Sequence, residues 1–211
     1  VSDEMEVALK NDMKKVLDLQ VRTVLRSTDV KIKYAATGTI GAPTSTFDTD
    51  GTISTAMARH VSTFDIKEVA DYLRGTLYAP PYEDNSYVCV CSVGFHRAIF
   101  DSQEFQDPAM RTDGARRIWK GEVNDFYNIR FVVESHAFSN TLTSSNYRGE
   151  AVVFGKDGWV RATALPPEIR IKVEEDFGRD KGMAWIGIQG WNEVFDTATA
   201  GEARIVHLTS L

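Results

Sequence analysis

The N-terminal part of the chain carries apolar residues at spacings of three and four positions. This pattern predicts one long helix over residues 3–25 with a single apolar stripe. Asp3 is expected to begin the helix, with Glu6 as its capping-box partner. The opposite face is charged and is expected to be solvated or to face another subunit. The stripe consists of Met5, Ala8, Leu9, Met13, Val16, Leu17, Gln20, Val21 and Val24.

The next segments show strand, loop and helix patterns in turn. Residues 30–34 alternate between apolar and polar side chains as an edge strand does. Residues 37–55 are rich in Thr, Ser and Gly and predict a loop or an irregular hairpin. Residues 62–77 predict a second amphipathic helix, which residues 79–81 end with two prolines. Its apolar side holds Ile66, Val69, Ala70, Leu73 and Leu77, and the polar residues Asp65, Lys67, Glu68 and Asp71 lie elsewhere on the helix.

Two apolar runs, residues 87–91 and 129–133, bound the central stretch of the chain. Because neither run alternates, both predict strands that are buried on both faces. After a break at Ser92 the first run continues into a short helix over residues 95–100. A polar segment over residues 101–121 joins this helix to the second strand. The arrangement is typical of the centre of an α/β layer.

The last part of the chain has mostly β patterns. Residues 151–160 predict either a hairpin about residues 156–157 or a strand that ends at Gly155 before a short helix. The Leu-Pro-Pro run at residues 165–167 is expected to interrupt the chain. Further strands are predicted over residues 169–173, 183–195 and 203–208, and the second of these carries apolar residues on both faces together with Trp185 and Trp191.

Composition excludes several classes of protein. The chain is 43% hydrophobic and 26% charged, which is ordinary for a globular protein, and no apolar run reaches the roughly 18 residues that a spanning helix needs. The net charge of −6 argues against broad electrostatic binding to nucleic acid. The acidic start is unlike a signal peptide. Because the chain begins at Val1 without an initiator methionine, we expect sequence upstream of it.

Candidate chemistry is sparse. Cys89 and Cys91 lie two positions apart on a predicted strand, so they share a face but are badly placed to bond to each other. The closest approach to a catalytic set is either cysteine with His96, which lacks a third group. We interpret this set as core cysteines beside a surface histidine. The histidines, His60, His96, His136 and His207, are dispersed without metal-ligand spacing.

Acidic residues offer no stronger candidate. Asp48 and Asp50 beside Gly51 resemble a calcium loop only faintly, because the glycine comes too early and the closing bidentate acid is absent. No phosphate-binding loop, dinucleotide fingerprint or nucleophile elbow is present. The sequence therefore predicts no catalytic residue, no cofactor and no metal site.

Short motifs follow one another through the second half of the chain. They are YVCV at residues 87–90, WKGEV at 119–123, NIRFVVES at 128–135, GKD at 155–157, DFGR at 176–179, MAWIG at 183–187 and GEARIV at 201–206. Their order resembles that of the tailed-bacteriophage major capsid proteins with the Hong Kong 97-type fold, and most closely the large-virion podovirus-like subfamily. The resemblance covers residues 64–211, and residues 3–34 by pattern only.

The resemblance implies an α+β fold with a long spine helix, an α/β axial domain and a β-rich peripheral domain. Residues 1–61 would form the first part of the peripheral domain, with the spine helix, a strand and a loop. Residues 62–165 would form the axial domain, and residues 166–211 the β return into the peripheral domain. The family places an amino-terminal arm and an extended loop before the spine helix, and neither precedes it in this sequence. The resemblance also implies a proline around residues 92–94, where this sequence has Ser-Val-Gly.

The implied function is that of a major capsid protein, which is not an enzyme. Such a protein assembles as hexamers and pentamers into the icosahedral shell around the double-stranded DNA genome of a tailed phage. Its place is the virion, after assembly in the host bacterial cytoplasm. Decoration, scaffolding and portal proteins would be further partners, with only weak contact to packaged DNA and no membrane contact. The alternatives are an encapsulin-like shell, a small α/β enzyme using a cysteine or carboxylate, and a monomeric binding module.

The polar segment over residues 101–120 is the candidate subunit interface. Its charges have mixed sign, which suits pairing across an interface, and its aromatic residues can act as apolar anchors. A solvated loop is the alternative interpretation. The candidate residues are Phe105, Arg111, Arg116, Arg117 and Trp119.

Overall fold

The computed structural model describes residues 2–34, 45–51, 60–100, 125–136, 138, 149–172, 182–195 and 201–210. The elements, in chain order, are α1 (Ser2–Ser27), β1 (Lys31–Tyr34), β2 (Ser45–Asp48), α2 (Thr63–Gly75), β3 (Tyr87–Ser92), α3 (Val93–Phe100), β4 (Asp125–Phe126), β5 (Ile129–Glu134), β6 (Gly149–Phe154), β7 (Trp159–Ile171), β8 (Met183–Glu193) and β9 (Ile205–Ser210). No helix in these ranges is long and apolar enough to cross a membrane.

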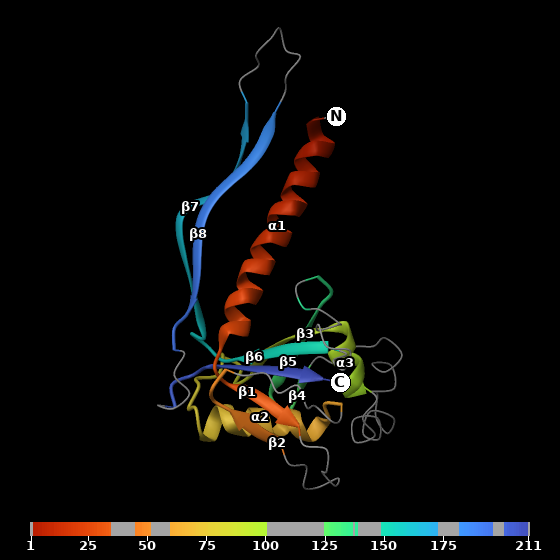
Figure 1. Ribbon diagram of the computed structural model, residues 1–211, viewed down its shortest axis with the longest axis vertical. Helices are drawn as coiled ribbons and strands as arrows, with labels where there is room; N and C mark the ends of the chain where they lie inside the picture. Colours follow the sequence, from red (N-terminus) through yellow and green to blue (C-terminus); the bar gives the residue numbers. More distant parts are fainter. Residues whose placement is uncertain are drawn as a thin grey trace.

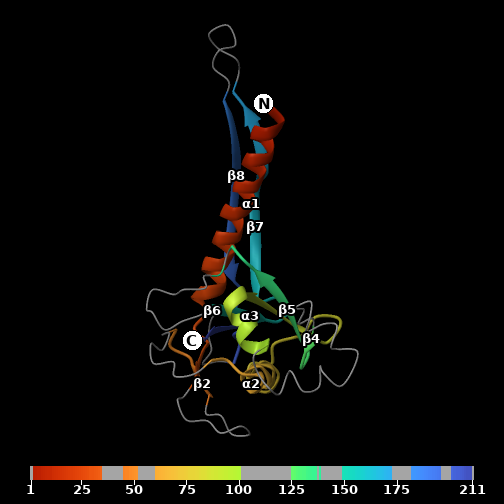
Figure 2. The ribbon, with the colours of Figure 1, turned by 90° about the vertical axis from the view of Figure 1, so that its right-hand side faces the viewer.

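The molecule has two parts, which we call the body and the limb. The body is a seven-stranded sheet with strand order β2-β1-β9-β6-β3-β5-β4, together with α2 and α3 (Figure 1). The limb is α1 with the two-stranded sheet of β7 and β8. Two views at right angles show α1 and the β7–β8 hairpin running side by side away from the body (Figures 1 and 2). The long N-terminal helix predicted from the sequence is thus confirmed as the main element of the limb.

The body sheet mixes parallel and antiparallel pairs. β3 and β5 are parallel neighbours, as expected for strands joined by a helix and a long connection. β6 pairs antiparallel with β3 on one side and with β9 on the other. β1 pairs antiparallel with β2 and in parallel with β9. Strands from the beginning, middle and end of the chain therefore share one sheet, while the domain boundaries at residues 61 and 165 stay a prediction.

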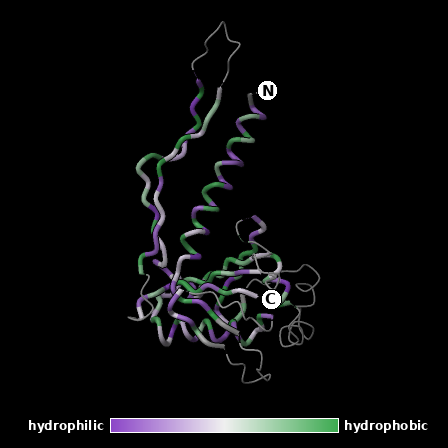
Figure 3. The backbone as a smooth tube through the Cα atoms, in the orientation of Figure 1, coloured by the Kyte–Doolittle hydropathy of each residue, from purple (hydrophilic) through white to green (hydrophobic). Residues whose placement is uncertain are grey.

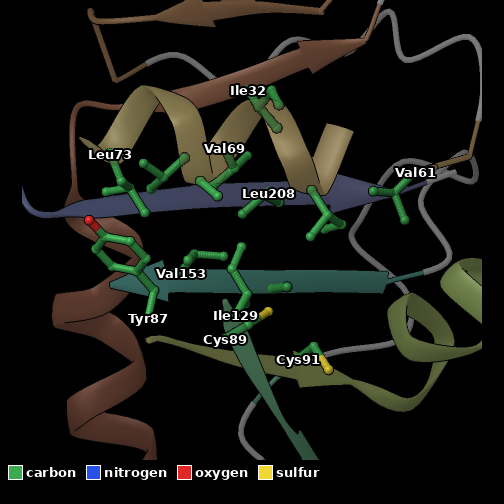
Figure 4. Close-up of a cluster of buried hydrophobic side chains, with 14 of the residues drawn as sticks. Ile32, Val61, Val69, Leu73, Tyr87, Cys89, Cys91, Ile129, Val153 and Leu208 are labelled. Atoms are coloured by element: carbon green, nitrogen blue, oxygen red, sulfur yellow. The ribbon is translucent and has the colours of Figure 1, made fainter. Parts of the chain in front are cut away.

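One hydrophobic core lies between α2 and the body sheet. The predicted apolar side of α2 is buried there, with Ile66, Val69 and Leu73 all at 0% exposure. Figure 4 shows Val69 and Leu73 beside Leu208 of β9 and, beyond it, Val153 of β6. Burial of this many large side chains on one face is what holds the helix in place, since isolated helices of this length are marginal in water.

A second, smaller core lies on the opposite face of the sheet, under the last turns of α1. Leu25 of α1 packs there with Val152 and Phe154 of β6 and Ile205 of β9. Because side chains alternate along a strand, Ala151 and Val153 of β6 lie in the first core, and Val152 and Phe154 lie in the second. The sheet is therefore covered on both faces at β6 and β9, which explains why both strands are buried at every position.

Local capping explains where α2 and α3 begin. Ser62 and Asp65 form a capping box at the start of α2, with the Ser62 N–H donating to Asp65 Oδ2 at 2.7 Å. Asp65 is consequently buried, although the sequence pattern placed it on the polar side. At the start of α3 the Ser92 hydroxyl accepts from the Phe95 N–H at 3.3 Å. Serine thus makes the strand-to-helix turn at which a proline was expected.

Two predictions about strand burial are wrong. β1 was predicted to be an edge strand, but it lies between β2 and β9 in the sheet. β5 was predicted to be buried on both faces, but Val132 and Val133 are each 45% exposed. Ile129 and Phe131 point to the buried face of β5, whereas Arg130 and Val132 share the opposite face, which is exposed. Val133 points to the buried side but lies near the end of the strand, where burial is lost. Strand patterns report how apolar a segment is, and the sheet order decides how much of it is covered.

Two predictions about chain interruptions also need correction. The Leu-Pro-Pro run at residues 165–167 lies inside β7, which continues across it with shifts in register. Each strand of a two-stranded sheet has one edge without a ladder partner, and such an edge tolerates proline. Residues 156–157 form a turn, but β6 before it pairs in the body and β7 after it pairs in the limb. This turn is neither of the two predicted forms.

Candidate subunit interface

The cysteines and His96, which come closest to a catalytic set, are embedded in the core. Cys89 and Cys91 are free thiols at 0% exposure, as predicted for core residues. Burial, reinforced by the neighbouring Cys91, raises the pKa of the Cys89 thiol well above its usual value, so the reactive thiolate is disfavoured. His96 is only 9% exposed and its ring packs against Phe100, so the prediction of a surface histidine is wrong. In the described ranges no three His, Cys, Asp or Glu side chains cluster as metal ligands do.

The interface residues predicted from the sequence lie outside the described residues. Phe105, Arg111, Arg116, Arg117 and Trp119 all fall within residues 101–124. Their role as an interface stays a prediction. The surfaces that the structure does describe point instead to the limb.

The inner face of the β7–β8 hairpin is joined to α1 by tryptophans. Trp185 of β8 donates through Nε1 to Asp12 at 3.1 Å, and Trp191 donates through Nε1 to Gln20 at 3.3 Å. The Trp191 ring also contacts the Trp159 ring of β7 at 5.5 Å between centroids. Aromatic side chains with one polar tip suit a contact that is apolar on one side and wet on the other. The sequence showed both tryptophans of β8 but not that α1 is their partner.

The outer face of β8 is uncharged and uncovered in the single chain, whereas β7 adds the exposed Glu168 and Arg170 opposite Ile186 and Ala184. Ile188 is 61% exposed, Ile186 40%, Val160 50% and Val194 42%. The outward positions of β8 carry no charge at all, since the remaining ones are Ala184, Gly190 and Asn192. Figure 3 shows hydrophobic and hydrophilic stretches alternating along the hairpin away from the body. A run of exposed apolar side chains on one face marks a surface that associates.

The apolar stripe of α1 is only partly covered. Leu9, Met13 and Leu17 are half-buried, whereas Met5 is 43% exposed. Val7, outside the predicted stripe, is 58% exposed. The stripe exists as predicted, but one hairpin is too narrow to bury it. Both layers of the limb therefore keep apolar surface that another chain could cover.

The outer edges of β7 and β8 also carry backbone N–H and C=O groups without a strand partner in the described residues. β7 and β8 pair with each other and with no other described strand, so each presents one open edge. An open edge of this length is a template for pairing with another chain unless proline or charge blocks it. Pro166 and Pro167 interrupt the edge of β7. β8 has neither proline nor charge from Met183 to Asn192.

Solved structures of phage capsids share this fold. The head structure of Helicobacter pylori bacteriophage KHP40 matches with a TM-score of 0.64 and 11% identity, over 98% of this chain and 68% of that chain. The capsid structure of the cyanophage P-SCSP1u matches with a TM-score of 0.63 and 12% identity, over 99% and 65%. A structure from Mycobacterium phage Che8 matches with a TM-score of 0.57 and 11% identity, over 98% and 61%.

These matches confirm the α+β fold of the Hong Kong 97 type that the motif order implied. At 11% to 12% identity they establish the fold of the chain and not its role. The chain spans 61% to 65% of the length of the Che8 and P-SCSP1u chains. No family model and no curated protein sequence matches it.

Proposed function

We propose that this protein is a major capsid protein, which assembles with copies of itself into the icosahedral shell around the double-stranded DNA genome of a tailed phage. The observation that carries this proposal is the match of 98% or more of the chain to structures of phage capsids and heads. The role is structural and not enzymatic, in keeping with the buried, unreactive thiol of Cys89. The protein's place is then the virion, after assembly in the bacterial cytoplasm.

The surfaces of the limb support assembly. A monomer gains nothing from an uncharged strand with Ile186 and Ile188 exposed, because such a strand invites aggregation. In a shell every subunit meets neighbours on several sides, and closed symmetry lets the same apolar face be covered in each copy. The exposed face of the limb is therefore the first candidate for a contact between subunits.

We propose that the two parts take the roles of the two domains that the resemblance implies, with bounds other than residues 61 and 165. In this proposal α1 is the spine helix, and the limb is the core of the peripheral domain. The body is the axial part, which would meet its neighbours around the centres of hexamers and pentamers. We assign β1, β2 and β9 to the axial part because they pair in the body sheet.

Other partners follow from the same proposal. Decoration, scaffolding and portal proteins would bind the assembled shell. Contact with the packaged DNA would be weak, because a chain with a net charge of −6 repels phosphate overall. The polar segment with Arg116, Arg117 and Trp119 remains a proposed second contact between subunits.

Substitution of Ile188 tests the proposal. Ile188→Asp places a charge on a side chain that is already 61% exposed, so the single chain is expected to fold normally. In a shell the same charge would be buried without a partner, and assembly should fail. Sedimentation and negative-stain electron microscopy would measure assembly, and circular dichroism would confirm folding.

The matched control is Ile188→Val, which keeps the face apolar and should give normal shells. Normal shells from Ile188→Asp would remove this face from the interfaces. A wild-type protein that stays near its monomer mass of 23.6 kDa under all conditions would overturn the capsid proposal and favour the enzyme or binding-module alternatives. Shells that enclose a protein cargo would indicate the encapsulin-like alternative.

A further inference from the structure

Three ionisable side chains meet where the last turn of α1 reaches the body sheet. Glu150 of β6 lies with Oε2 3.3 Å from Arg26 Nε of α1 and 3.5 Å from His207 Nε2 of β9. The Glu150 and His207 side chains are 0% and 1% exposed, whereas the Arg26 side chain keeps 29%. Arg26 is thus the member of the cluster that solvent reaches, and it belongs to the limb.

The buried carboxylate depends on its ion pair. Neither oxygen of Glu150 nor Nε2 of His207 has a hydrogen-bond partner in the structure. A buried charge without hydrogen bonds is costly unless an opposite charge is close, and removal of that partner is strongly destabilising. The cation that neutralises the buried anion of the body is therefore carried by the limb. Two ligands beside a fixed cation are not a metal site.

The cluster extends the second core, which seats α1 on the sheet. Glu150 alternates along β6 with Ala151 and so faces the same side as Val152. Leu25, the residue before Arg26, packs on this side of the sheet. The Thr28 hydroxyl also donates to the Ile205 carbonyl at 2.9 Å. Apolar contacts and one hydrogen bond would keep the base of α1 attached even when the ion pair is weakened.

The packing under α1 leaves room for movement. A hollow of about 290 Å³ lies beside the second core, between α1 and the body sheet. Its lining includes Val21 and Leu25 of α1, Val90 of β3 and Trp159 of β7. This hollow is open to solvent on one side, so the side chains that line it are less confined than those of the core under α2.

The protonation state of His207 decides which cation pairs with Glu150. Burial lowers the pKa of His207 below its usual value, Glu150 opposes this shift, and Lys31 and Arg26 add to it. Glu150 comes from β6, Lys31 from β1 and Arg26 from α1. At neutral pH the imidazole is therefore neutral, and Arg26 is the counter-charge of Glu150. In acid a protonated His207 would give Glu150 a second cation and would repel Arg26.

We propose that Arg26, Glu150 and His207 form an acid-sensitive latch, in which Arg26 holds the base of α1 against the sheet until His207 takes up a proton. Protonation then pairs Glu150 with a cation of the body itself. The attraction between Glu150 and Arg26 then weakens, and the limb can rotate about the second core. This inference goes beyond shell formation and concerns the single chain, so it can be tested whether or not shells form.

Spin labels on the two parts would report the position of the limb. Lys14→Cys on α1 and Tyr78→Cys on the body are exposed sites, and Tyr78 is 79% exposed. The native Cys89 and Cys91 are fully buried and would not compete for the label. Because the pKa of His207 lies below the usual histidine value, pulsed electron paramagnetic resonance over a pH series from about 7.5 down to about 4 would give the distance distributions, and circular dichroism at each pH would confirm that the protein is folded.

The wild-type protein should show a displaced population that rises by about fivefold or more in acid, the lower end of usual coupling between sites. His207→Gln, which keeps a neutral hydrogen-bonding group, should abolish the rise. Arg26→Gln should show the displaced population already at neutral pH. His96→Gln removes a buried histidine elsewhere in the body and should leave the wild-type response, as a matched control.

The same acid response in His207→Gln as in the wild type would overturn the latch. A single narrow distance in Arg26→Gln at neutral pH, with normal circular dichroism, would overturn it equally. If Arg26→Gln does not fold, the comparison of His207→Gln with His96→Gln still decides the question.

Discussion

The body and the limb are built from the same kinds of residue but are completed to different degrees. In the body, β6 and β9 are buried at every position because α2 covers one face of the sheet and α1 the other. In the limb, β8 alternates between half-buried and exposed positions and has no fully buried residue. The body is a finished core, whereas the limb has a covered side and an open side. A single chain therefore buries the core of the body completely, whereas the limb keeps a face that another chain could cover.

The largest effect should come from a cavity in the body. Leu73→Ala removes a side chain at 0% exposure from the core under α2, and should lower the free energy of unfolding by about 2–5 kcal/mol. The matching truncation in the limb, Ile188→Ala, should change it by less than about 0.5 kcal/mol, because that side chain is already solvated. Urea denaturation would measure both. Equal losses would show that Ile188 is as buried in solution as Leu73 and would contradict the comparison.

A smaller and local effect is expected where the hairpin meets α1. Trp191→Ala removes the contact with Trp159 and the hydrogen bond to Gln20. Hydrogen exchange should then quicken in α1 and β8, with a local cost of about 1–3 kcal/mol, and stay unchanged in β6 and β9. Trp191→Phe keeps a ring and should show a weaker change. Faster exchange throughout the body would show that the effect of the substitution is not local to the limb.

The smallest effect is the acid sensitivity of the body at His96. Burial lowers the pKa of His96 below its usual value of about 6.5, so the folded body binds this proton less readily than the unfolded chain. Stability is therefore fully present above about pH 6.5 and falls as the pH drops below it. His96→Gln should flatten this slope in urea denaturation from about pH 7 to pH 5. An unchanged slope would show that His96 does not titrate on unfolding.

Periodic segments were the most predictable parts of the fold. The stripe from Met5 to Val24 is long enough to specify a helix whatever covers it, and α1 is that helix. The segment of β8 with apolar residues on both faces and the apolar run of β3 also marked strands correctly. The interface residues nominated from the sequence lie outside the described residues and stay a prediction. The open face at Ile186 and Ile188 could have been suspected from apolar residues on both sides of that strand.

The sequence by itself determined the three helices and most strands, the buried thiols and the absence of a catalytic motif, because periodicity and residue type act over a few neighbouring positions. It did not show that β7 continues across residues 165–167. Only the tertiary structure decided which strands pair, since pairing joins residues far apart in the chain, such as Lys31 with His207. It also placed β6 and β7 in different sheets although one turn separates them. The meeting of Arg26, Glu150 and His207 has the same origin. No local pattern brings together one side chain from a helix end and two from distant strands, and only the packing of α1 on the sheet does so.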